Sequence, residues 1–94
     1  MIKALVRFTV EDFEKWKSVF IEASALRKSF GSMSAKAFSK TDIQNEIFVF
    51  LDFESQEKAA QMFQSAEFRE VTKHGGMVAP PEVTFLDEVI SLPA

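Results

Sequence analysis

Residues 46–53, EIFVFLDF, are apolar at almost every position and so on both faces that an extended strand presents. Successive side chains of a strand point to opposite faces. One face of this stretch carries Ile47, Val49, Leu51 and Phe53. The other carries Phe48 and Phe50, and only Glu46 and Asp52 are polar. A strand with one face in water normally alternates apolar and polar residues. The pattern therefore predicts a central strand that is covered on both faces.

The flanking sequence supplies further strands and two helices. Alternating apolar residues predict strands at 2–10, 33–41 and 82–90, in addition to 46–53, with a turn at 41–45 between the two middle strands. An apolar period near 3.6 predicts one helix over 13–30 that begins after Asp12 and ends at Gly31. A second helix is predicted to begin after Ser55, to break at 65–67 and to stop at 75–76.

The order β-α-β-β-α-β predicts a ferredoxin-like α+β fold that occupies residues 1–94 as a single domain. In that fold a four-stranded antiparallel sheet carries both helices on one face. The other sheet face stays bare in a monomer, although the strands are apolar on both sides. Because large bare apolar patches are rare on monomers, we expect this face to hold a ligand, a second copy of the chain in a barrel-like homodimer, or both.

Composition and missing motifs narrow the function classes. The net charge is −3 with acids and bases mixed along the chain, which speaks against a nucleic-acid partner. The sequence has no run of about 18 apolar residues and no signal-like N-terminus, so we expect no membrane span and a cytoplasmic location. It has no Cys, and it lacks the common nucleotide-binding and paired metal-ligand motifs, so we expect no cofactor and no metal. Eleven Phe and no Tyr suit a dry core or an apolar cavity.

Three stretches resemble a known superfamily over nearly the whole chain: VRFTVEDFEKWKSVF (6–20), LDFES (51–55) and GGMVAPPEVTFLDEV (75–89). They are similar to the dimeric α/β-barrel proteins related to antibiotic-biosynthesis monooxygenases, including a cyclase-like subgroup. The resemblance implies a homodimer, and it implies chemistry such as cofactor-free oxidation of quinol-like aromatics, haem degradation, lactone isomerisation or polyketide cyclisation. Fold membership does not select among these reactions. Phe8 stands where the subgroup often has His, and the haem-degrading residue set does not map onto this chain.

The candidate catalytic residues are His74, Arg7 and Asp52. His74 is the only imidazole and could move a proton near neutral pH, or could simply face solvent at a helix C-terminus. Arg7 and Arg27 could each bind an anionic or carbonyl oxygen, or could be solvated at the surface or held in an ion pair. Asp52 interrupts an apolar strand, so it would be paired or have a raised pKa if buried, or would otherwise lie in water.

The candidate binding residues could line an apolar cavity, and they are Trp16, Phe20, Phe50, Met62 and Met77. Ordinary core packing explains the same residues, because Trp16 lies on the apolar stripe of the first predicted helix. Two functions follow. One is a monooxygenase-type or cyclase-type enzyme that acts on a small hydrophobic, aromatic or polyketide-like molecule. The other is a ligand-binding or stress-related structural dimer without turnover. A cavity of roughly 300 Å³ or more beside His74 or Asp52 would favour the enzyme.

Overall fold

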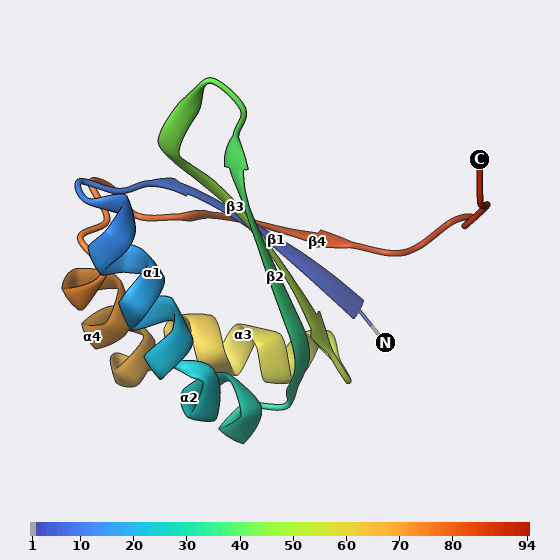
Figure 1. The fold of residues 1–94 in the computed structure, drawn as a ribbon. Helices are drawn as coiled ribbons and strands as arrows, with labels where there is room; N and C mark the ends of the chain where they lie inside the picture. The colour runs from blue at the N-terminus through green and yellow to red at the C-terminus, as the bar shows by residue number, and fades with distance from the viewer. Residues whose placement is uncertain (1) are drawn as a thin grey trace.

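Four strands form one antiparallel sheet in the order β2-β3-β1-β4, and the helices pack against one of its faces (Figure 1). The computed structural model describes residues 2–94. The elements are β1 (Ile2–Thr9), α1 (Phe13–Glu22), α2 (Ser24–Ser29), β2 (Ser32–Lys40), β3 (Ile43–Phe53), α3 (Gln56–Gln64), α4 (Ala66–His74) and β4 (Glu82–Leu86). This arrangement confirms the predicted α+β, ferredoxin-like fold. No helix within residues 2–94 is long and apolar enough to cross a bilayer.

The core lies between the sheet and the helices, and β3 supplies its centre. The side chains of Ile47 and Phe53 are 0% exposed, and those of Val49 and Leu51 are 3% exposed. The neighbouring side chains on β1 are also buried. Val6, for example, pairs with Val49 and is 3% exposed. Burying an aliphatic or aromatic side chain of this size contributes about 1.5–3 kcal/mol. The predicted inward face of the central strand is therefore confirmed.

The first helical region is two helices, so the prediction of one continuous helix over 13–30 was wrong. Asp12 caps α1 as expected, accepting a hydrogen bond from the backbone N–H of Lys15 at 3.1 Å. The helix is interrupted at Ala23, and the carbonyl of Phe20 just before it accepts a hydrogen bond from Nη1 of Arg27 at 2.8 Å. A side-chain donor that draws a carbonyl out of the helical ladder is a recognised cause of such interruptions.

The hairpin between β2 and β3 is tighter than predicted. The turn is only Thr41 and Asp42, because Lys40 already pairs with Ile43, and β3 therefore begins before residue 46. A register shift between Ser39 and Lys40 accompanies this turn. Residues 43 and 44 are exposed, so backbone pairing rather than burial extends the strand there. A pattern of buried positions could not have found them.

The last strand ends at Leu86, so the predicted extension to residue 90 was wrong. Leu86 pairs with Lys3 in antiparallel register, and the residues after Leu86 therefore run past the beginning of β1. The chain leaves the body of the fold at this point (Figure 1). Its apolar side chains are exposed, with Val89 at 93% and Ile90 at 73%.

Ser65 joins α3 to α4, which confirms the predicted break in the second helical region. Its extended backbone ends α3 (φ −74°, ψ 152°) and begins α4. The hydroxyl Oγ donates to the carbonyl of Met62 at 2.7 Å and accepts from the N–H of Phe68 at 3.1 Å. One side chain therefore satisfies a terminal carbonyl of one helix and a terminal N–H of the next.

Replacing Ser65 with Ala should lower the free energy of unfolding by about 1 kcal/mol, because an N-cap Ser is worth roughly that amount. Urea denaturation would measure the change. Ser18→Ala is the matched control, since Ser18 is an exposed residue of α1. We expect that control to stay within about 0.5 kcal/mol of the parent. Equal urea midpoints for S65A and the parent would contradict the double cap.

Candidate functional site

An apolar pocket lies between the sheet and the helices, with a free volume of about 60 Å³. Its sheet side is formed by Val6, Phe8, Val49 and Leu51. The remaining lining residues belong to the helices and the segment after α4, and they are Trp16, Val19, Phe20, Ala23, Leu26, Arg27, Met62, Phe63, Phe68, Val71, Thr72, Gly75 and Met77. Arg27 is the only charged side chain among these lining residues. The pocket is thus lined by apolar side chains, by Thr72 and by the guanidinium-bearing Arg27.

Trp16 forms the aromatic centre of this wall. It is 5% exposed, and its indole stacks on the ring of Phe20 with centroids 5.1 Å apart. The ring of Phe8 lies 5.7 Å away on the sheet side. Gly75 allows the indole this position, because a Cβ there would lie 3.3 Å from Trp16 Cδ1. The centre of the site is therefore a cluster of aromatic rings packed around one indole.

The structure brings together four of the residues predicted to bind a ligand: Trp16, Phe20, Met62 and Met77. Phe50 lies elsewhere, since its neighbours Val49 and Leu51 face the helices and it faces the open side of the sheet. There its ring meets that of Phe38 edge-on at 5.8 Å. The candidate binding residues are thus divided between the two faces of the sheet.

His74 is the last residue of α4, and its side chain is exposed. Phe68, Val71, Thr72 and Gly75 line the pocket at spacings of three, four and seven residues along the helix, which is the helical period. His74 comes six residues after Phe68 and falls off that face. Of the two alternatives that the sequence leaves open for His74, the structure therefore shows the solvent-facing position at the helix C-terminus.

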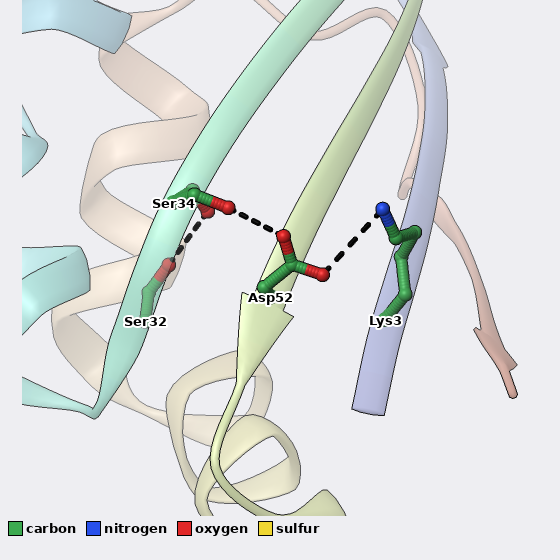
Figure 2. Close-up of polar contacts among 4 residues, drawn as sticks. All are labelled: Lys3, Ser32, Ser34 and Asp52. Carbon is green, nitrogen blue, oxygen red and sulfur yellow. Dashed lines mark hydrogen bonds and ion pairs between the residues drawn. The ribbon is translucent and has the colours of Figure 1, made fainter. Parts of the chain in front are cut away.

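Arg7 and Asp52 both lie on the open face of the sheet, opposite the pocket. Arg7 forms an ion pair with Glu46 at 2.7 Å, and its guanidinium lies 5.5 Å from the ring centroid of Phe48. Asp52 accepts a hydrogen bond from Ser34 Oγ at 2.5 Å and pairs with Lys3 at 3.5 Å (Figure 2). The Ser34 hydrogen bond, helped by the nearby lysine charges, holds the pKa of Asp52 below its ordinary value. Asp52 is therefore a paired carboxylate.

Arg27, which the sequence offers beside Arg7 as a possible oxygen-binding residue, lines this pocket. The helical spacing contained the signal, since Trp16, Phe20, Ala23 and Arg27 follow one another at four, three and four residues. The break at Ala23 does not disturb this order, and all of these residues line the pocket. Within residues 2–94, no three His, Cys, Asp or Glu side chains gather as a metal site would require.

The fold is shared with solved oxygenase structures. A protein from Bordetella bronchiseptica described as a candidate antibiotic biosynthesis monooxygenase superposes with a TM-score of 0.83 at 18% identity, covering 95% of this chain and 97% of that one. SnoaB, a cofactor-independent oxygenase from Streptomyces nogalater, gives a TM-score of 0.80 at 15% identity, covering 99% of this chain and 97% of its own.

A third structure is a monooxygenase from the gene ActVA-Orf6 of Streptomyces coelicolor, in complex with nanaomycin D. Its TM-score is 0.69 at 23% identity, with coverage of 99% of this chain and 92% of that one. No protein-family model matches the sequence, and a search of curated proteins found no significant match. The predicted antibiotic-biosynthesis-monooxygenase-like fold is therefore confirmed by structural likeness.

Replacing Ser34 with Ala should raise the pKa of Asp52 toward its ordinary value, because the strongest partner of the carboxylate is lost. In the parent the folded pKa lies below the unfolded value of about 3.9. The stabilisation is thus present above that value and disappears as the pH falls through the folded pKa. The melting temperatures of S34A and parent should therefore differ near pH 7 and converge in strong acid. Ser39→Ala, an exposed serine of β2, is the control. An equal difference at both pH values would contradict this assignment.

Proposed function

We propose that the apolar pocket binds a small hydrophobic, aromatic or polyketide-like molecule, and that the protein acts on it as a monooxygenase-type or cyclase-type enzyme without metal or nucleotide. The observation that carries the proposal is the shared fold with SnoaB, a cofactor-independent oxygenase, together with an apolar pocket centred on Trp16. The complex of the ActVA-Orf6 monooxygenase with nanaomycin D supports a small-molecule ligand. A cytoplasmic location is part of the same proposal.

Ligand entry requires side chains to move. A free volume of about 60 Å³ is far below the roughly 300 Å³ at which ligand pockets begin. A wider groove of about 580 Å³ lies outside, between α4 and residues 77–83. Phe63, Phe68, Thr72 and Met77 line both the pocket and this groove. Displacement of these shared side chains would join the two spaces into one site.

The chemistry proposed for the pocket is the orientation of an electron-rich ring while water is excluded. In the monooxygenase-type reaction the substrate would supply the electrons and dioxygen would accept them, one oxygen atom entering the ring and the other leaving as water. The protein therefore has to position the ring and accept a proton. We propose His74 as the proton acceptor, because it is the only imidazole of the chain and adjoins Gly75, a residue of the pocket wall. Its exposed side chain would have to turn toward the bound ring to take the proton. Arg7 and Asp52 lie on the open sheet face and would take part only where two sheets meet.

We also propose that the protein is a homodimer formed through the open sheet face. The aromatic residues of that face remain partly uncovered, and Phe38 is 54% exposed. Around them lie ion pairs of Arg7 with Glu46 and of Lys3 with Asp52, which suit the rim of an interface. The segment after Leu86 exposes Val89 and Ile90, so it too would gain from a second copy.

A second candidate function is ligand binding or a stress-related structural role without turnover. The small free volume of the pocket and the exposed position of His74 favour it. Under this alternative the pocket residues serve mainly as core, and the dimer is the functional unit. Oxygen consumption separates the monooxygenase-type enzyme from this alternative, and conversion of a polyketide-like phenol without oxygen uptake separates the cyclase-type enzyme from it.

Val71→Phe should abolish oxygen uptake, because a larger side chain at this lining position would fill the pocket. An oxygen electrode and a panel of quinols and polyketide-like phenols would measure it. His74→Ala should lower the rate by roughly 10²-fold or more, as expected for a general base. Val89→Phe is the control, since Val89 is 93% exposed and lies away from the pocket. Equal, near-zero rates of oxygen uptake in the parent and all variants would contradict the monooxygenase-type activity.

Phe38→Lys should dissociate the dimer, because it places a charge in the middle of the proposed apolar contact. Sedimentation at micromolar concentration would then report the 10.6 kDa monomer in place of the dimer. Ile21→Lys, on α1 and 63% exposed, is the matched control and should leave the mass unchanged. A monomeric parent under these conditions would contradict assembly through the sheet.

A further inference from the structure

Arg27 is a cation held at an apolar pocket without an acidic partner. Its guanidinium lies 4.0 Å from the ring centroid of Phe20, and Nη1 donates to the carbonyl of Phe20 at 2.8 Å. Within residues 2–94 the structure shows no ion pair for this side chain. Partial burial lowers its pKa, because the charged form loses hydration. A guanidinium has five N–H donors, so most of them are free to bind something else.

A second hollow adjoins the pocket at the same arginine. It has a volume of about 200 Å³ and lies between α2 and β2. Phe20 and Arg27 line both spaces, and the hollow adds Lys28 and three serines, Ser24, Ser32 and Ser34. Of these serines, Ser34 donates its hydroxyl to Asp52 and Ser32 donates to the carbonyl of Ser34. It has no acidic lining residue. The apolar pocket therefore continues into a hollow that carries the two cations Arg27 and Lys28, and Arg27 lies at the junction.

We propose that the ligand of the pocket is an amphiphilic anion, namely an aromatic carboxylic acid whose ring enters the apolar pocket and whose carboxylate pairs with Arg27. This inference rests on the ligand-binding pocket of the proposed function and adds the substrate class. A planar guanidinium matches a carboxylate with two parallel hydrogen bonds, and such charge-assisted bonds are about twice as strong as neutral ones. The stacking on Phe20 holds the guanidinium in place for this contact.

The other arginines lack this combination. Arg7 already pairs with Glu46 and lies on the opposite face of the sheet. Arg69 is exposed on α4, donates to the carbonyl of Gln64 at 3.3 Å and lines the outer groove. Arg69 therefore offers a chemically matched control, being a helical arginine with one backbone hydrogen bond outside the pocket.

The test is calorimetric binding of two probes of nearly the same shape, 2-naphthoate and 2-naphthamide, to the full chain. We expect the parent to bind the anion roughly tenfold to a hundredfold more tightly, as one charge-assisted pair at a half-buried site provides. Arg27→Gln should remove this preference and leave naphthamide affinity within about twofold, which also shows that the pocket is still folded. Arg27→Lys, which keeps the charge but loses the planar fork, should fall between them. Arg69→Gln should behave as the parent.

Each other result overturns the inference in a distinguishable way. If both probes bind equally well and R27Q changes neither, the pocket binds ligands but does not select anions. If R69Q rather than R27Q weakens naphthoate, the anion lies in the outer groove. If neither probe binds the parent at millimolar concentration, the ligand-binding pocket of the proposed function fails together with this inference.

Discussion

Alternation along β3 is the constraint on which the rest of the molecule depends. Ile47, Val49, Leu51 and Phe53 all lie beneath the helices and are almost completely buried. Because a shift of one residue would turn the whole set to the other face, this burial fixes the register of β3 against both neighbours. The apolar stripes of the helices then have one surface on which to pack. The pocket is the part of that interface which the side chains do not fill completely.

The sequence predicts the elements well where local chemistry marks them. Asp12 and Ser55 cap helices as expected, because a short polar side chain before an apolar period has few other roles. The break predicted at 65–67 lies at Ser65. The errors come where non-local contacts decide. The hydrogen bond of Arg27 accompanies the break at Ala23, and the beginning of β1 determines where β4 ends. Neither contact is visible in a local pattern.

The site was predicted in part, and the reason lies in the two apolar faces of the central strand. Trp16, Phe20 and Met62 follow helical periods, which indicate the face that packs on the sheet. Phe50 belongs to the opposite face, and a sequence that is apolar on both faces gives no means of choosing between them. Arg27 was missed for the opposite reason. A charged residue on an apolar stripe is normally predicted to lie at the surface, and only the three-dimensional structure shows that it lines the pocket.

Trp16 also gives the molecule a simple optical property. The chain has one Trp and no Tyr, so almost all of its absorbance and emission in the near ultraviolet arises from this indole. The indole is 5% exposed and lies in the wall of the pocket. A shift in its emission wavelength therefore reports a change in the surroundings of that wall without any added label. A change in the space beside Phe20 is therefore detected through the fluorescence of one indole.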